Sequence, residues 1–316
     1  MDNFIGVDIG GTSVKIGIVT GEGKIIKKDI IAINPRDEFE NIIVPVKNWI
    51  KNYFKDKDKK KVKAIGVGTP GFIDKRNGIL VSGSENVPML KKHATAKILE
   101  DFIGIPAYQD NDGTCAAAGE LMFGKGKKYK DFVMITLGTG IGGGLVLNGK
   151  IYRGAKGFAG EIGHMCLDPN GSWCNCGSRG CFEQYASGPA MVSNFKNKLI
   201  KRNIEINEEI TPKYIFETAN LTKEITGEIA KQVIEDAGLK IAQAFGTLLN
   251  ILNLEAFIIG GGISKSGGLL LPYVKKHLPD FVWPELGKNV DVMIAELQNN
   301  AGIIGAAAMA YERLGS

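Results

Sequence analysis

The stretch FIGVDIGGTSVKIGIV, residues 4–19, decides the fold. Apolar, β-compatible residues lead into Gly10-Gly11-Thr12 and alternation then resumes, which predicts two strands joined by a glycine turn. The pattern returns in FVMITLGTGIGGGLVL, residues 132–147, which aligns with the first stretch without a gap and places Gly138 on Gly10. Internal similarity of this kind predicts two related domains.

Further elements follow from composition and periodicity. Apolar residues at helical spacing predict a helix over residues 37–54, with Pro45 either kinking it or marking its first turn. AIGVG (64–68) and the apolar part of AFIIGGGIS (256–264) are expected to be buried strands, and GTCAAAGELMFG (113–124) a helix after Asn111-Asp112.

Three glycine turns therefore follow apolar strands, at Gly10, Gly138 and Gly260. Glycine lets backbone N–H groups approach an anion closely, so three such turns favour a nucleotide-binding site. No GxxxxGK[ST] is present, which excludes a P-loop. LGTGIGGG contains GxGxxG, but a strand follows it instead of a helix, which argues against a dinucleotide-binding fold.

Composition describes a globular protein of one to three domains: 316 residues, 44% hydrophobic and 23% charged. The N-terminus lacks the features of a signal peptide, and the apolar run from Ala301 is too short to span a bilayer. The net charge of +5 comes largely from lysine runs at 55–63 and 125–130, interpreted as solvated loops or helix ends without a nucleic-acid motif. A cytoplasmic location is expected.

Three of the five cysteines lie in CNCGSRGC, residues 174–181. Their short loops around glycines suit tetrahedral thiolate coordination of a metal. Free thiols or a disulfide are the alternative, although three clustered cysteines cannot all pair with each other. Cys115 and Cys166 are expected to be ordinary core residues.

The motifs resemble those of the ROK family, named for repressors, open reading frames and kinases, over almost the whole chain. DIGGTSVK and LGTGIGGG are similar to its two phosphate motifs, GGGIS to its adenosine-side turn, and EIGH with CNCGSRGCFE to its sugar and zinc signature. The resemblance implies an α/β fold of duplicated actin-like (ribonuclease H-like) ATPase domains with a cleft between two lobes. The expected lobes are residues 1–112 plus 300–316, and residues 113–299 with the zinc loop.

The resemblance also implies roles for individual residues. Asp8 would orient Mg²⁺ through water, and Lys15 would either approach phosphate or cap a strand end. The expected ATP contacts are Asp8, Gly10, Gly11, Thr12, Lys15, Gly138, Thr139, Gly140, Gly261 and Gly262. His164 would join Cys174, Cys176 and Cys181 around a structural zinc, since four protein ligands leave no open position.

Sugar contacts are carried over in the same way: Gly71, Asn86, Asn111, Asp112, Glu161, His164 and Glu183. Asp112 would be the base that acts on the primary hydroxyl. Without the family, the simpler interpretation of Asn111-Asp112 before a helix is N-capping. Asp110, one residue earlier, receives no role.

The resemblance thus predicts a transferase that uses ATP to phosphorylate the C6 hydroxyl of a hexose, most like glucokinase and forming glucose 6-phosphate in glycolysis. Alternatives are an N-acetylmannosamine or N-acetylglucosamine kinase and, less favoured, a sugar-sensing regulator without activity. Only seven residues precede Asp8, too few for a helix-turn-helix. We expect a homodimer with no nucleic-acid or membrane partner, and Phe72 as a candidate to exclude N-acetyl groups.

Overall fold

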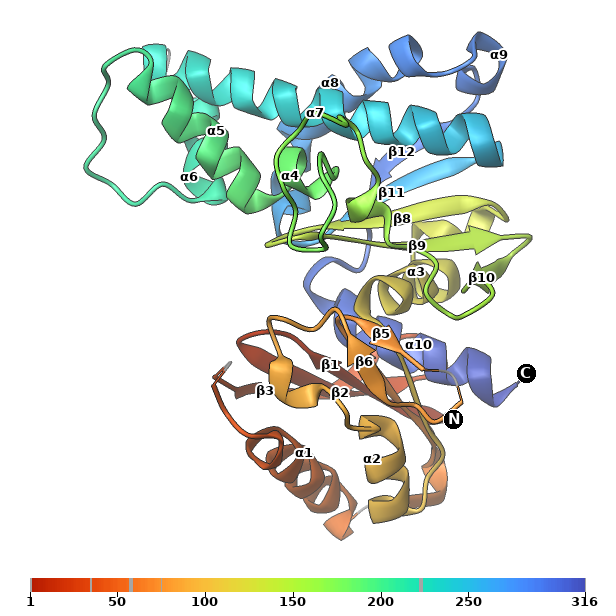
Figure 1. Ribbon diagram of the computed structural model, residues 1–316. Coiled ribbons are helices and arrows are strands. Elements are labelled where there is room, and N and C mark those ends of the chain that lie inside the picture. The colour runs from red at the N-terminus through yellow and green to blue at the C-terminus, as the bar shows by residue number, and fades with distance from the viewer. Residues whose placement is uncertain (1, 35, 57–58, 75, 222–223, 316) are drawn as a thin grey trace. The chain divides into compact units, whose positions relative to one another are not determined.

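The computed structural model describes residues 2–34, 36–56, 59–74, 76–221 and 224–315 (Figure 1). These residues form two compact units. Unit 1 comprises residues 1–128, 144–160 and 299–316, and unit 2 comprises residues 129–143 and 161–298. The lobe boundaries expected from the sequence stay a prediction.

The first sheet lies in unit 1 and has the strand order β3-β2-β1-β4-β7. β1–β2 and β2–β3 are antiparallel, whereas β1–β4 and β4–β7 are parallel. The strands are β1 (Asn3–Ile9), β2 (Ser13–Thr20), β3 (Ile25–Ala32), β4 (Val62–Thr69) and β7 (Ala107–Asn111). A separate hairpin pairs β5 (Phe72–Ile73) with β6 (Leu80–Ser82).

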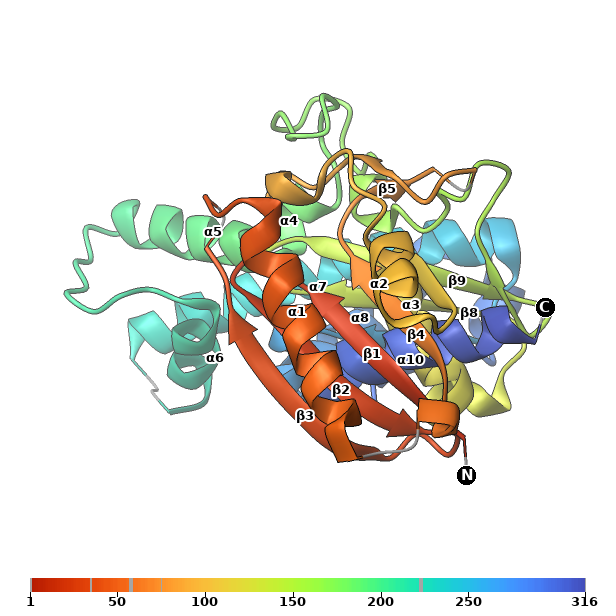
Figure 2. The ribbon, with the colours of Figure 1, turned by 90° about the horizontal axis from the view of Figure 1, so that it is seen from below.

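Helices cover both faces of this sheet. α1 (Phe39–Tyr53) and α2 (Thr95–Ile103) lie on one face, and α3 (Asp112–Phe123) and α10 (Ala301–Leu314) lie on the other (Figures 1 and 2). α10 approaches the strands so closely that a Cβ on Gly66 would lie 1.8 Å from the carbonyl oxygen of Ala306. Glycine in β4 is therefore what admits this helix.

The second sheet has the order β10-β9-β8-β11-β12. β8–β11 and β11–β12 are parallel, and β9–β10 is antiparallel. The strands are β8 (Phe132–Leu137), β9 (Ile141–Leu147), β10 (Lys150–Tyr152), β11 (Ala256–Gly260) and β12 (Asp291–Ile294). Its order matches that of the first sheet when β8 is placed on β1, so the internal repeat predicted from the two glycine-rich stretches is confirmed as a repeat of topology.

The longest helix among the described residues, α7, belongs to unit 2. Its buried face contacts α5, α6 and α8. The set is α4 (Glu183–Ala186), α5 (Gly188–Ile200), α6 (Pro212–Leu221), α7 (Ile225–Leu252), α8 (Gly267–His277) and α9 (Pro284–Gly287). None of the helices in the described ranges is both long and apolar enough to cross a membrane.

The expected elements are confirmed where local pattern was clear. The helix predicted over 37–54 is α1, with Pro45 inside it and not in its first turn. The buried strands are β4 and β11, and the helix after Asn111 is α3. Most described lysines of both runs are exposed around short 3₁₀ turns, whereas Lys63 is half-buried in β4. Residues 57–58 of the first run lie outside the described residues.

Candidate functional site

The first glycine turn lies between β1 and β2 in unit 1. Gly10 N–H donates to the Ser13 carbonyl at 3.0 Å, which closes the turn. Asp8 and Lys15 are cross-strand partners, with Nζ 3.5 Å from Oδ2. Burial raises the pKa of Asp8 and the Lys15 charge lowers it, with burial the stronger effect. In this structure Lys15 therefore partly compensates the charge of a half-buried carboxylate.

Gly302, the second residue of α10, makes room for Asp8. A Cβ at Gly302 would lie 2.0 Å from Asp8 Oδ2 and 2.3 Å from its Cγ. Neither group can move freely, because Gly302 belongs to a helix packed on the sheet and Asp8 to a central strand.

Gly302→Ala would displace Asp8, for which the ROK resemblance implies a role at Mg²⁺. We therefore expect it to lower kcat about 100-fold, the order of effect of a displacement of about 1 Å at a reacting centre. The measurement is steady-state kinetics with ATP, alongside a melting curve. Gly315→Ala at the other end of α10 is the control, because its nearest neighbours would be 3.9 Å away. Equal kinetics in the two variants would show that the position of Asp8 does not limit the reaction.

A second group of candidates surrounds the junction of β7 and α3, also in unit 1. Asn111 is the N-cap of α3, and its Oδ1 accepts hydrogen bonds from the N–H groups of Gly113 and Thr114. Its Nδ2 donates to the Gly71 carbonyl at 3.4 Å, so the structure brings these two predicted sugar contacts together. Capping uses only the oxygen of the amide, so it does not conflict with the predicted sugar contact.

Asp112 is the first residue of α3, and its Oδ1 accepts the Gly113 N–H at 2.8 Å. Gly71 has φ +94°, where a side chain would be strained, and a Cβ there would collide with the Ser82 carbonyl at 2.4 Å. Asn86 lies beside the first turn, since a Cβ on Gly11 would touch its Cβ at 3.4 Å. These predicted sites thus share one unit and one set of loops.

The second glycine turn, between β8 and β9, belongs to unit 2. Gly138 N–H donates to the Gly140 carbonyl at 3.0 Å, and the Gly188 N–H at the start of α5 donates to the Gly138 carbonyl at 2.9 Å. Glu183 Oε2 accepts the Ile141 N–H at 2.9 Å. The residue predicted to bind sugar therefore also holds this turn.

A cavity of about 750 Å³ adjoins the turn. Gly138, Thr139 and Gly262 line it, whereas Gly261, with φ +87°, lies against the backbone of Leu137. The rest of its lining is mostly apolar and was not found from the sequence, because no local motif marks it: Gly188, Pro189, Val192, Ile210, Thr211, Pro212, Lys213, Phe216, Glu217 and Ile263.

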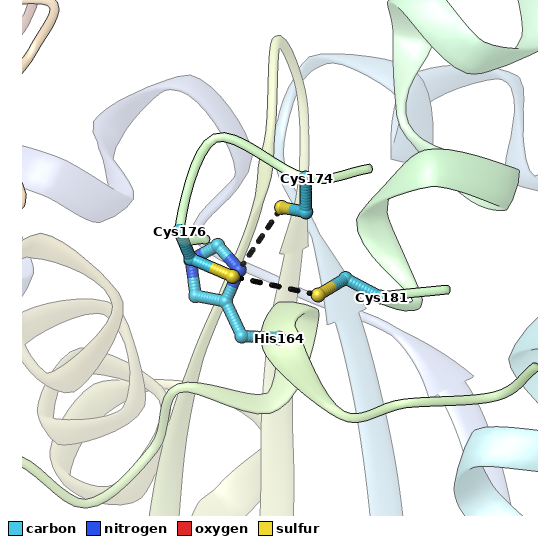
Figure 3. A group of neighbouring side chains, drawn as sticks. All are labelled: His164, Cys174, Cys176 and Cys181. Carbon is cyan, nitrogen blue, oxygen red and sulfur yellow. Dashed lines mark hydrogen bonds between the residues drawn. The ribbon is translucent and has the colours of Figure 1, made fainter. Parts of the chain in front are cut away.

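The cysteine cluster forms as predicted (Figure 3). One ligand atom from each of His164, Cys174, Cys176 and Cys181 lies within 4.8 Å of the others. His164 Nδ1 is 3.6 Å from Cys174 Sγ, and Cys176 Sγ is 3.5 Å from Cys181 Sγ. Four such atoms from two close loop segments match the tetrahedral donor set that zinc prefers.

Two glycines close the loop around these ligands. Gly177 and Gly180 have φ of +88° and +62°, and a Cβ on Gly180 would lie 1.7 Å from the Asp168 carbonyl oxygen. Cys166 is exposed, so its expected place in the core is wrong, while Cys115 is buried as expected. Cys166 lies in an irregular loop, where its backbone forms an isolated bridge with Cys181, and not in a regular strand or helix of the core.

The other ring nitrogen of His164 faces Glu161, with Nε2 3.9 Å from Oε2. Burial raises the pKa of Glu161; the neighbouring His164 lowers it and Glu183 raises it. Glu161, His164 and Glu183 thus form one polar group in unit 2 beside the cysteine cluster.

Comparison with known proteins adds an independent line of evidence. The ROK family model matches residues 4–313. The glucokinase of Thermotoga maritima is 32% identical, and the alignment covers 99% of this chain and 98% of that protein. The xylose repressor of Caldicellulosiruptor bescii is 29% identical, and the alignment covers 97% of this chain and 77% of that protein.

Among solved structures, a ROK family glucokinase from Streptomyces griseus, in complex with glucose and AMPPNP, is similar with a TM-score of 0.83 and 31% identity. The alignment covers 98% of this chain and 99% of that chain. This likeness confirms the predicted duplicated actin-like ATPase fold.

Proposed function

Because the chain belongs to the ROK family, we propose that it transfers the γ-phosphoryl group of ATP to the C6 hydroxyl of a hexose, with glucose as the substrate. The observation that carries the proposal is the end-to-end likeness to glucokinases together with an intact Asn111-Asp112 junction. The product would be glucose 6-phosphate, which enters glycolysis.

Asp112 is the proposed base. Transfer to a hydroxyl needs a group that orients and deprotonates it, and a carboxylate at a rigid strand–helix junction can do so. Asn111 and Gly71 would orient the sugar from the same loops, with Asn86 nearby. Glu161, His164 and Glu183 are further proposed hydroxyl partners. All these roles are carried over from the family resemblance.

The two glycine turns are the proposed phosphate contacts, through Gly10, Gly11, Thr12, Gly138, Thr139 and Gly140. The cavity beside Gly138 and Gly262 is the proposed adenosine pocket, since its volume suits a ligand of that size and its apolar lining suits a base. Asp8 is the proposed carboxylate for Mg²⁺, which keeps several waters and needs few protein ligands. Bound Mg²⁺ would neutralise phosphate charge.

We propose that the His164, Cys174, Cys176 and Cys181 cluster holds a structural zinc ion. The donor chemistry fits, and all four positions are filled by protein, so no open position remains for catalysis. Because His164 points Nδ1 at the cluster, its Nε2 is left to face Glu161 and a sugar hydroxyl. Two cysteines, Cys166 and Cys176, are exposed, which suits a reducing compartment, so we propose that the protein acts in the cytoplasm. We also propose that it forms a homodimer.

Discrimination against N-acetyl sugars is assigned to Phe72. Its ring packs edge to face on Phe158 with centroids 5.0 Å apart, and it directly follows Gly71, whose carbonyl binds Asn111. A fixed apolar ring offers no partner to an acetamido group. This contact favours glucose over the alternative N-acetylmannosamine or N-acetylglucosamine kinase.

We expect kcat/KM for glucose to exceed that for either N-acetyl sugar about 100-fold, the effect of an unpaired buried amide or a clash. The assay compares glucose, mannose, fructose, N-acetylglucosamine and N-acetylmannosamine by ADP release under one set of conditions. Phe72→Ala should narrow the preference, whereas Phe102→Ala, on the exposed side of α2, should not. A higher kcat/KM for an N-acetyl sugar than for glucose would contradict the proposed substrate but not the proposed kinase activity.

The second candidate function is a sugar-sensing regulator, favoured by the likeness to xylose repressors. The same ADP-release assay separates the two, because a sensor would bind a sugar without turning over ATP.

A further inference from the structure

Four charged side chains form a cluster in unit 1 behind the β7–α3 junction, which we call the Arg153 cluster: Asp110, Arg153, Glu312 and Arg313. The Asp110 side chain is 8% exposed and that of Arg153 12%. Arg153 Nε donates to Asp110 Oδ2 at 2.6 Å, and its Nη1 and Nη2 donate to the two oxygens of Glu312 at 3.1 and 2.6 Å. Arg313 Nη2 lies 3.8 Å from the same oxygen of Asp110.

The cluster joins three segments that are distant in sequence. Asp110 belongs to β7, Arg153 follows β10, and Glu312 is near the end of α10. One planar guanidinium reaches both carboxylates, a geometry that the single ammonium of lysine cannot reproduce. Removing charges from water is costly, and a well-packed apolar group would often serve stability as well. A charged guanidinium at this position is therefore better explained by a role that depends on the direction of its hydrogen bonds.

The other oxygen of Asp110 contacts the backbone of the next residue. Asp110 Oδ1 accepts the Asn111 N–H at 3.0 Å, which fixes the peptide that leads into the junction. Asn111 in turn caps α3 and binds Gly71, and Asp112 follows as the first helical residue. Two hydrogen bonds therefore lead from Arg153 through Asp110 to the Asn111 N–H, and Asp112, the proposed base, is the next residue in the chain.

We propose that Arg153 is a positioning residue for phosphoryl transfer: by holding Asp110 from behind, it fixes the Asn111 peptide and thereby the carboxylate of Asp112. The inference rests on the proposed function, in which Asp112 is the base. Arg153 touches the reacting groups only through Asp110. If the cluster only held α10 on the sheet, its substitution would lower stability but would not lower kcat while leaving KM unchanged.

The first test compares Arg153→Lys, Arg153→Ala and Glu312→Gln with wild type. We expect kcat to fall about 100-fold in Arg153→Ala and about tenfold in Arg153→Lys and Glu312→Gln, the range for small misplacements. KM for glucose and ATP should stay within about threefold, since the base contributes little to ground-state binding. Arg76→Met, which breaks an exposed ion pair with Asp74 in the same unit, is the control and should leave kcat unchanged.

The second test is chemical rescue. A cavity of about 260 Å³ is lined by Tyr108, Asp110, Arg153, Gly157 and Arg313, among others, so a small cation can reach the space left by Arg153→Ala. Millimolar guanidinium should restore part of the lost kcat in Arg153→Ala and leave wild type and Arg76→Met unaffected. Urea at the same concentration should restore nothing, because it is neutral. A merely structural loss would not respond in this way.

All assays are run well below the melting temperature of each variant. Calorimetric titration with glucose measures the fraction of each protein that is folded and able to bind. Arg153→Lys and Glu312→Gln variants that fold and keep kcat within about threefold of wild type would overturn the inference, as would KM rising in step with the loss of rate. If Arg153→Ala does not fold, the Arg153→Lys and Glu312→Gln variants decide. Failure of the proposed function is distinct, because wild type itself would then be inactive.

Discussion

Asp112→Asn is expected to lower kcat by about 10²- to 10⁴-fold, the range that general-base catalysis contributes. Glucose affinity should stay within a few-fold of wild type, because loss of a base removes transition-state stabilisation. The amide oxygen of asparagine can still accept the Gly113 N–H that Asp112 Oδ1 now accepts, so the start of α3 is preserved. The substitution therefore changes the chemistry of the side chain and little else.

The measurement pairs single-turnover kinetics with calorimetric titration of glucose. Asp101→Asn, an exposed carboxylate on α2 in the same unit, is the control and should behave as wild type. A loss of glucose affinity as large as the loss of rate would show that Asp112 acts mainly in binding.

Cys176→Ser is expected to abolish zinc binding, lower the melting temperature and raise KM for glucose together. Wild type should contain about one zinc per chain, because one complete donor set is present among the described residues. The three effects share a cause: metal binding supplies folding free energy to a loop that has no sheet or helix of its own, and His164 belongs to both the metal cluster and the proposed sugar group.

Metal content is measured on protein purified without chelator or affinity metal. Cys166→Ser is the matched control, since Cys166 is exposed in the same loop but stands outside the cluster. Zinc-free wild type, or a Cys176→Ser variant with normal zinc content, would refute the assignment of these ligands.

Much of the fold and the site follows from local sequence. Gly10 and Gly138 mark turns after apolar strands, and a turn of this kind is fixed by a few neighbouring residues. The cysteine cluster is also predictable from the sequence, because short spacing alone brings Cys174, Cys176 and Cys181 within reach of one ion. The N-cap at Asn111, the alternative that the residues alone favour, is present in the structure, which adds a contact with Gly71.

Tertiary structure decided the contacts between distant segments. Nothing near Asp110 in the sequence indicates that Arg153 and Glu312 surround it, because ion pairs across β7, the β10 loop and α10 depend on how those elements pack. The cavity beside Gly138 likewise takes Phe216 and Ile263 from separate segments. Asp8 illustrates both kinds of information. The sequence places it before a glycine turn. The requirement for glycine at position 302 follows only from the tertiary structure, in which a helix almost three hundred residues away packs against Asp8, and no local sequence pattern indicates this contact.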